Sequence, residues 1–185
     1  GGGVGSIVTQ IAKIIGCKVI GIAGGREKCD FVKSLGADSV IDYKNENVAK
    51  RIEELASDGI DIYFDNVGGE TLTAALDNLA MYSRIVLCGS ISEYILDEPF
   101  GPINYTNLRS TNSSMNGFFV YNHEVDFPEA EEKIANWIKE DLIKVKEDIT
   151  IGFKNMPLGL QNLYAGKNKG VALCKILDDS ELIFD

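Results

Sequence analysis

The stretch GGGVGS at residues 1–6 runs without a break into the apolar segment IVTQIAKII at residues 7–15. Glycines let a backbone approach a pyrophosphate closely, and the first N–H groups of the helix that follows face the anion. Gly2 and Gly5 keep the last G-x-x-G spacing of the dinucleotide fingerprint, in which the later glycine permits close packing of helix on strand. The sequence therefore predicts a dinucleotide-binding turn made by Gly2, Gly3, Val4 and Gly5.

The remainder of that fingerprint, its first glycine and the strand before it, is expected upstream of residue 1. That strand is central in the usual order 3-2-1-4-5-6. We therefore expect the chain to be a fragment of a longer protein, unless residues 182–184 or another chain supply the strand. Three glycines at a chain end also fit the remnant of an expression tag, and this alternative stays open for Gly1.

Composition narrows the class of protein. With 185 residues, 45% hydrophobic and 25% charged, the chain suits one soluble globular domain. The net charge of −10 argues against a nucleic-acid partner, and the lack of an apolar run near ~18 residues argues against a membrane span. A single histidine and four scattered cysteines (Cys17, Cys29, Cys88 and Cys174) give no basis for a metal site or a disulfide framework, and we expect a cytoplasmic protein.

Helical and strand patterns alternate in the first half of the chain. Helices are expected over residues 7–15, 27–35, 47–57 and 71–80, and strands over residues 17–23, 39–41, 60–64 and 84–89. This alternation with short connections predicts a doubly wound parallel sheet with helices on both faces. Ligands of such sheets gather at the carboxyl ends of the strands, where the candidate contact segments are residues 24–26, 42–44, 66–68 and 89–91.

The second half departs from this rhythm. Residues 90–114 form a long polar loop of the kind that usually serves a site, residues 115–121 resemble a sixth strand, and residues 129–140 an amphipathic helix. The pattern changes at residues 149–153, and a helix from Pro157 to Ala165, a turn at 166–170 and a strand at 171–177 follow. The change predicts that residues 148–177 pack on another domain and that residues 178–185 form an acidic tail.

The choice of nucleotide depends on the end of the second strand. An NAD site normally places Asp or Glu there, to accept hydrogen bonds from the ribose 2′-hydroxyl. This chain has Gly24-Gly25-Arg26-Glu27-Lys28, which leaves room and positive charge for a 2′-phosphate, so NADP(H) is favoured. Alternatively, Arg26 and Lys28 only decorate a surface helix, and Glu27 only serves the helix dipole.

Several strings carry a family resemblance: residues 4–6 (VGS), 21–29 (GIAGGREKC), 41–44 (IDYK), 63–70 (YFDNVGGE) and 84–92 (RIVLCGSIS). They resemble the zinc-free, NADP-dependent medium-chain dehydrogenase/reductases. The nearest branch is that of prostaglandin reductase, leukotriene B4 12-hydroxydehydrogenase and the alkenal double-bond reductases. The resemblance runs from about residue 3 to about residue 177, and its most specific part is the string FDNVGGE.

The resemblance implies a two-domain reductase with an N-terminal GroES-like catalytic domain and a C-terminal Rossmann domain. On this basis residues 1–147 are the NADP-binding Rossmann domain without its first strand. Residues 148–177 return to the GroES-like domain, which this sequence lacks, and the fragment alone is expected to be inactive.

The same resemblance implies roles for particular residues. Lys28 and Tyr43 hold the 2′-phosphate, after the glycines Gly24 and Gly25. Tyr105 lies near the nicotinamide ribose and substrate as the candidate catalytic residue, although a loop tyrosine also fits simple packing. The remaining cofactor contacts are Asn66, Cys88, Gly89, Ser90 and Ile91 toward the nicotinamide, the backbone of Phe118, Phe119 and Val120 at the carboxamide, and Asn168 on the phosphate side; for residues 118–120 a buried strand is the plain alternative.

The implied chemistry is hydride transfer from NADPH to the β-carbon of an α,β-unsaturated aldehyde or ketone, with no metal. A quinone oxidoreductase and a non-catalytic NADPH-binding or sensing module remain alternatives. The resemblance also implies a homodimer formed through the edge of the sixth strand, residues 115–121.

Overall fold

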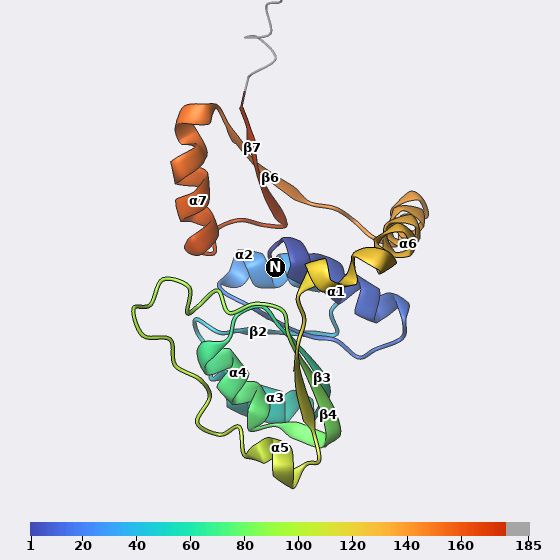
Figure 1. Ribbon diagram of the computed structural model, residues 1–185, viewed down its shortest axis with the longest axis vertical. Coiled ribbons are helices and arrows are strands. Elements are labelled where there is room, and N and C mark those ends of the chain that lie inside the picture. Colours follow the sequence, from blue (N-terminus) through green and yellow to red (C-terminus); the bar gives the residue numbers. More distant parts are fainter. Residues whose placement is uncertain (177–185) are drawn as a thin grey trace, which may run out of the picture. The chain divides into compact units, whose positions relative to one another are not determined.

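The computed structural model describes residues 1–176 of the chain (Figure 1). These residues divide into two compact units, one formed by residues 1–40 with the chain from residue 131 onward, the other by residues 41–130. The first unit thus joins segments that are far apart in the sequence.

The N-terminal part of the first unit contains α1 (Gly3–Ile14), β1 (Ile20–Ala23) and α2 (Arg26–Ser34), with β2 (Ser39–Asp42) at the boundary and hydrogen-bonded to β1. Both helices end before a glycine of positive φ, which stops the helix by accepting the left-handed conformation. α2 packs on β1 through Val32, whose Cγ1 lies 2.5 Å from where a Cβ on Gly21 would be. Only glycine fits there.

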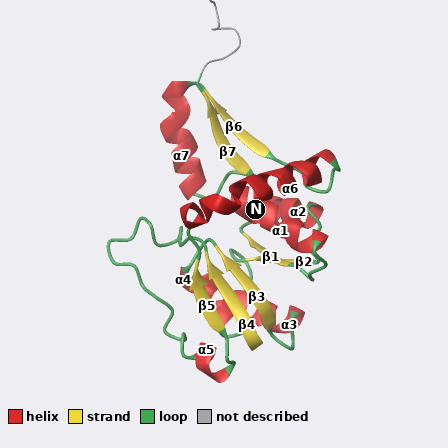
Figure 2. Cartoon of the chain, turned by 45° about the vertical axis from the view of Figure 1, so that its right-hand side comes forward, coloured by secondary structure: helices red, strands yellow, loops and turns green. Residues whose placement is uncertain are grey.

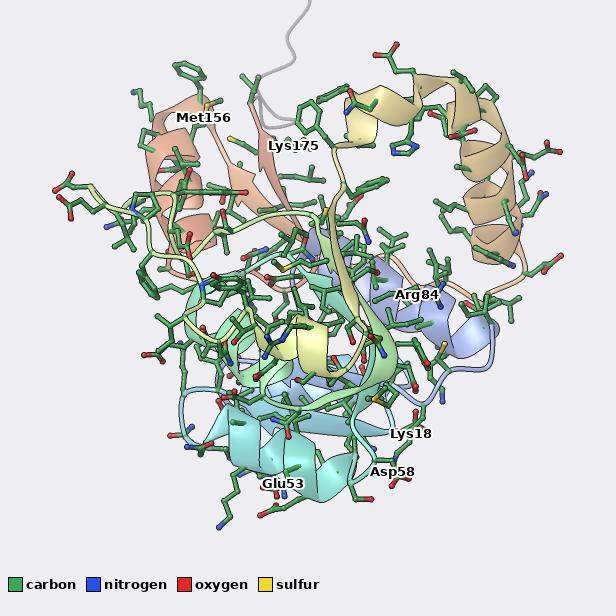
Figure 3. The ribbon with its side chains drawn as sticks, turned by 60° about the horizontal axis from the view of Figure 1, so that its bottom comes forward. Lys18, Glu53, Asp58, Arg84, Met156 and Lys175 are labelled. Carbon is green, nitrogen blue, oxygen red and sulfur yellow. The ribbon has the colours of Figure 1, made fainter. Side chains whose placement is uncertain are left out.

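The C-terminal part of the first unit contains β6 (Glu147–Ile151), η2 (Phe153–Asn155), α7 (Met156–Tyr164) and β7 (Val171–Lys175). β6 and β7 pair in parallel, and α7 lies alongside them, drawn orange to red in Figure 1. Met156 at the start of α7 and Lys175 at the end of β7 are labelled in Figure 3. Gln10 of α1 ties this part to the N-terminal part, since its amide accepts from the Lys144 N–H at 2.7 Å and donates to the Lys144 carbonyl at 3.0 Å.

The second unit contains one parallel sheet and helices that connect its strands. The sheet has the order β3 (Ile60–Asp65), β4 (Leu79–Leu87), β5 (Ser114–Gly117), side by side in Figure 2. Its core is formed by Leu72 and Leu76 of α4 (Gly69–Leu76) against Ile85 of β4. The other elements are α3 (Val48–Leu55), α5 (Asn107–Ser110), η1 (Val120–Asp126) and α6 (Phe127–Lys139), which crosses into the first unit.

The α/β architecture with parallel strands is confirmed. The pairings β1-β2 and β3-β4-β5 are those found in the doubly wound order on either side of its first strand. Residues 182–184, one candidate for that strand, and the tail at 178–185 lie outside the described residues.

Two expected elements are wrong in their extent. The helix expected over 71–80 ends at Leu76, because Leu79 already pairs with Ile60 as the first residue of β4. The sixth strand, expected over 115–121, covers only Ser114–Gly117. The last hydrogen bond between β4 and β5 runs from the Phe118 N–H to the carbonyl of Leu87, the last residue of β4. Beyond it β4 offers no further partner, and the chain continues into η1.

Smaller differences concern the cysteines. β1 begins at Ile20, so Cys17 precedes the strand expected over 17–23, and Cys88 follows the end of β4. Cys174 does lie in a strand, β7, and all four thiols are half-buried and unpaired with each other in the described chain.

Candidate functional site

The start of α1 has the properties of an anion site. Its N-cap is Gly2, in extended conformation, and among residues 1–176 no side chain caps it and no acidic residue occupies its first turn. The first N–H groups of a helix carry partial positive charge, so an anion would satisfy them. Val4 in this turn is 53% exposed, and the turn can therefore be approached from solvent.

The glycines of this turn have different surroundings. A Cβ on Gly3 would contact the Val171 side chain at 3.4 Å, whereas a Cβ on Gly5 would meet no atom of the described chain within 4 Å. The strand on which Gly5 is predicted to pack is the one expected upstream of residue 1, so the open space beside Gly5 leaves that prediction as it stands.

Residues 166–170, here called the C-terminal turn, hold the start of α1 in place. Gly170 forms a parallel bridge with Gly2, and its N–H donates to the Gly1 carbonyl at 3.0 Å. Asn168 is buried, and its Nδ2 donates to the Gly170 carbonyl at 2.9 Å and lies 3.8 Å from where a Cβ on Gly2 would be. Asn168 thus supports the turn beside the predicted phosphate position.

The first turn of α2 carries the charged side chains on which the predicted choice of NADP(H) over NAD(H) depends. Its N-cap is Gly25, with φ +87° and open space where a Cβ would be. Lys28 runs beside Gly1, with its Cδ 3.6 Å from a Cβ built there. Glu27 forms an ion pair with Lys169 of the C-terminal turn at 2.7 Å, and this hydrogen bond and the lysine's charge lower the pKa of the Glu27 carboxyl. Arg26 lies 3.8 Å from Asp30 on the exposed face.

In the second unit the loops after β3 and β4 are joined by backbone hydrogen bonds. The N–H groups of Cys88 and Gly89 both donate to the Asp65 carbonyl, at 2.8 and 3.1 Å, and the Ile91 N–H donates to the Asn66 carbonyl at 3.2 Å. The Ser90 N–H donates to the Tyr94 hydroxyl at 3.1 Å. Asn66 and residues 88–91, predicted to act together, are therefore brought together at the carboxyl ends of these strands.

Asp65 organises this junction from beneath. Its side chain is 1% exposed, and its Oδ1 accepts from the N–H groups of Val67 at 2.8 Å and Gly68 at 3.0 Å. Its buried Oδ2 has no hydrogen-bond partner within the described residues. The carboxylate fixes the turn between β3 and α4, on which Asn66 lies.

The environment of Asp65 affects two neighbours. Burial, and then the negative charge of Asp65, raise the pKa of the Cys88 thiol, so the thiol is disfavoured as a nucleophile. The same two causes raise the pKa of the Tyr63 hydroxyl well above its usual range. The junction holds neutral side chains around one buried charge.

The two predicted tyrosines lie in the second unit. Tyr43 follows β2 and is 47% exposed. Tyr105 precedes α5 and is 59% exposed, with its carbonyl accepting from the Leu108 N–H at 3.1 Å. The neighbouring Asn104 anchors this part of the loop to the Thr73 carbonyl at 2.9 Å.

Residues 118–120 differ from their expectation. Phe118, Phe119 and Val120 are 37%, 63% and 44% exposed, so the alternative of a buried strand is wrong. The Phe118 N–H is engaged by the Leu87 carbonyl at 2.8 Å, and its ring stacks on His123 with centroids 4.9 Å apart. The Phe118 N–H is thus not open to a carboxamide in this structure.

One cavity of the second unit lies away from these strand ends. It has a volume of about 510 Å³ and is lined by residues that include Glu53, Asp58 and Leu79. Leu79 is the first residue of β4 and Asp58 lies just before β3, so the cavity is at the amino ends of the strands. Glu53 and Asp58 are labelled there in Figure 3.

The residues present fit a phosphorylated dinucleotide. In the first unit an uncapped helix start, a glycine with open space and Lys28 offer backbone donors, room and positive charge. The one acidic side chain of the α2 first turn, Glu27, is paired with Lys169. The residues of the second unit that were predicted to approach the nicotinamide stand on a junction fixed by Asp65.

Sequence reasoning missed three residues of the site. Asp65 lies in the string FDNVGGE, and an Asp whose side chain accepts from the N–H groups two and three residues later is a known turn signal that could have identified it. Glu93, whose Oε1 accepts from the Gly69 N–H at 3.2 Å, and Lys169 make contacts across 24 and 142 residues of sequence. No local pattern announces such contacts.

Two kinds of feature are absent from the described residues. Within residues 1–176 no helix is long and apolar enough to cross a membrane. The same part of the chain contains no group of three or more His, Cys, Asp or Glu side chains arranged to hold a metal ion.

Comparison with known proteins supplies a family. The model of the family described as zinc-binding dehydrogenase matches residues 3–136. The chain is 39% identical over 171 residues to a 2-alkenal reductase (NADP(+)-dependent) of Nicotiana tabacum, covering 91% of this chain and 50% of that protein. It is 38% identical over 182 residues to prostaglandin reductase 1 of Bos taurus, covering 94% of this chain and 54% of that protein.

A solved structure agrees with these relatives. CurA from Vibrio vulnificus, crystallised in complex with NADPH, has a TM-score of 0.87 and 36% identity, over 96% of this chain and 55% of that one. The chain thus spans about half the length of the proteins it matches. The resemblance to the prostaglandin and alkenal reductase branch is confirmed by the names of these relatives.

Proposed function

The chain belongs to the zinc-binding dehydrogenase family, and from this membership we propose that it is the NADP(H)-binding part of a reductase of carbon–carbon double bonds. The substrates are α,β-unsaturated aldehydes and ketones. The relatives' printed names support this class, since one is an NADP-dependent 2-alkenal reductase and another a prostaglandin reductase.

The observation that carries the proposal is the first turn of α2. It follows β1 at the position where an NAD site has an unpaired carboxylate, and it offers Lys28 while its own Glu27 is paired with Lys169. A 2′-phosphate is attracted by such a turn, whereas a ribose 2′-hydroxyl finds no carboxylate prepared for it. NADPH and NADP+ are accordingly the proposed cofactor.

Each predicted residue has a proposed role in holding that cofactor. The start of α1, at Gly2, Gly3, Val4 and Gly5, binds the pyrophosphate, and Gly24, Gly25, Lys28 and Tyr43 receive the 2′-phosphate. Asn168, in the C-terminal turn, contacts the phosphate side of the cofactor. The nicotinamide end is assigned to Asn66, Cys88, Gly89, Ser90 and Ile91, and to the backbone of Phe118, Phe119 and Val120 at the carboxamide.

When bound, NADPH supplies the hydride that adds to the β-carbon while a proton adds to the α-carbon, leaving NADP+ and the saturated carbonyl compound. The protein's part is to orient the two partners and to exclude water between them. Tyr105, exposed on an anchored loop, is the proposed residue on the substrate side. The raised pKa of the Cys88 thiol argues against a covalent intermediate on that residue.

The assay uses the full-length protein that contains this chain. Consumption of NADPH at 340 nm is followed with 4-hydroxynonenal or 1-nonen-3-one, and in parallel with 1,4-benzoquinone. Saturated product from the enal or enone supports the proposal. Turnover of the quinone alone identifies a quinone oxidoreductase, and saturable NADPH binding without turnover of either identifies a sensing module.

Assembly and location complete the proposal. We propose a homodimer formed through the edge of the sheet at residues 115–121, which include Phe119 at 63% and Tyr121 at 64% exposure. Sizing of the full-length protein by light scattering tests this, and a monomer at micromolar concentration contradicts it. A cytoplasmic location, which cell fractionation tests, is part of the same proposal.

A further inference from the structure

Two segments of the first unit meet at an ion pair. Lys169, in the C-terminal turn that joins α7 to β7, places its Nζ 2.7 Å from Oε2 of Glu27 in the first turn of α2. The blue α2 and the red end of α7 are close together in Figure 1. The pair is separated by 142 residues of sequence.

The C-terminal turn presents Lys169 on a fixed backbone. The Lys169 N–H donates to Oδ2 of Asp148 at 3.1 Å, and the preceding Asn168 is buried and bonded to Gly170. Gly170 in turn bridges Gly2 at the start of α1. The lysine is thus held on the element that also supports the predicted pyrophosphate position.

The ion pair between Lys169 and Glu27 contributes little to the stability of the fold. The Glu27 side chain is 82% exposed and that of Lys169 38% exposed, and ion pairs in such positions contribute little to folding. Its effect is local. Glu27 is the one acidic residue in the α2 first turn and directly precedes Lys28, so its carboxylate lies on the turn that is proposed to receive the 2′-phosphate.

We propose that Lys169 is a positioning residue that determines cofactor specificity: by holding the Glu27 carboxylate it keeps an unpaired negative charge away from the 2′-phosphate. This inference rests on the proposed function. Without Lys169, Glu27 is left free to repel a 2′-phosphate and to accept a hydrogen bond from a 2′-hydroxyl. The preference for NADP+ over NAD+ should then fall.

Three variants test the inference on the full-length protein by titration calorimetry with NADP+ and NAD+ at low ionic strength. Lys169→Ala should weaken NADP+ binding by roughly five-fold, the scale of one surface charge pair, and leave NAD+ binding equal or tighter. Glu27→Gln should change NADP+ binding by less than about two-fold, because the charge it removes is already paired. Lys167→Ala, in the same turn but exposed, is the matched control for total charge.

The double variant Lys169→Ala with Glu27→Gln separates two mechanisms. If Lys169 acts through Glu27, NADP+ affinity returns to within about two-fold of the wild type. If the loss persists in the double variant, Lys169 is a direct phosphate ligand and the inference is wrong. An equal loss in Lys167→Ala also overturns it, because the effect would then come from net charge alone.

Failure of this inference is distinguishable from failure of the proposed function. A wild-type protein that binds NAD+ as tightly as NADP+ overturns the cofactor assignment and the inference together. A wild type that prefers NADP+, with an unchanged preference in Lys169→Ala, overturns the inference alone. Thermal melts of each variant check that the fold is retained.

Discussion

Replacing Asp65 by alanine should open the turn between β3 and α4. Oδ1 of Asp65 accepts from the N–H groups of Val67 and Gly68 at 2.8 and 3.0 Å, at a site where the side chain is 1% exposed. A hydrogen bond to a charged group contributes about 1.5–3 kcal/mol, but burying a carboxylate has its own cost, which the unpartnered Oδ2 increases. The net expected loss is about 2–4 kcal/mol of local stability.

The assay is amide hydrogen exchange, which reports on the turn itself. In Asp65→Ala the amides of Val67 and Gly68 should exchange faster by about 30-fold to 900-fold, the factors that correspond to that free energy. Asp65→Asn should stay within about 1 kcal/mol of the wild type, because the asparagine Oδ1 accepts the same bonds.

Asp61→Ala, on the exposed side of the same strand, is the matched control and should leave both amides unchanged. An acceleration below about three-fold in Asp65→Ala would refute the argument that this carboxylate holds the turn.

Two further predictions concern other parts of the chain. Gly170→Ala should destabilise the first unit by about 2–5 kcal/mol in chemical denaturation. The reason is that Gly170 has φ +77° and that a Cβ there would lie 2.0 Å from the Lys146 carbonyl oxygen. Gly101→Ala, at a position with open space around it, is the control, and equal unfolding midpoints for the two variants would contradict the clash. Alkylation of Cys88 by iodoacetamide, followed by mass spectrometry, should be half-maximal above pH 9.0, because burial and the charge of Asp65 both disfavour the thiolate and so raise its pKa; a midpoint below pH 9.0 would rule this out.

Much of the fold could be predicted because its signals are local. The glycines after α1 and α2 mark where those helices end, and Asn47 caps α3 by accepting from the Lys50 N–H at 3.0 Å. Alternating strands and helices then leave few topologies to consider. These features need no information from distant residues.

The errors arose where the outcome depends on a distant partner. In residues 75–80 (ALDNLA) the apolar spacing suits a helix, but Leu79 pairs with Ile60 and so begins a strand. β5 stops at Gly117 because β4 offers no further partner, which the apolar residues Phe118–Val120 do not reveal. The apolar pattern of one strand does not show how long the strand beside it in the sheet will be.

The candidate site follows the same rule. The glycine turn, Lys28 and the strand-end segments could be found from motifs, since backbone geometry and charge there depend on adjacent residues. Lys169 could not be given its role, because it acts on Glu27, which only the folded chain brings near. Asp65 acts on the N–H groups two and three residues later, so its role has a local signal.

The bridge between Gly2 and Gly170 has a consequence for biosynthesis. A ribosome delivers the glycine turn long before the segment that braces it, so the proposed phosphate site remains unfinished while the residues between them are translated. Contacts between such remote residues also close slowly, because a long loop must be ordered first. A nascent polypeptide stalled before residue 166 should therefore fail to be retained on an immobilised nucleotide resin.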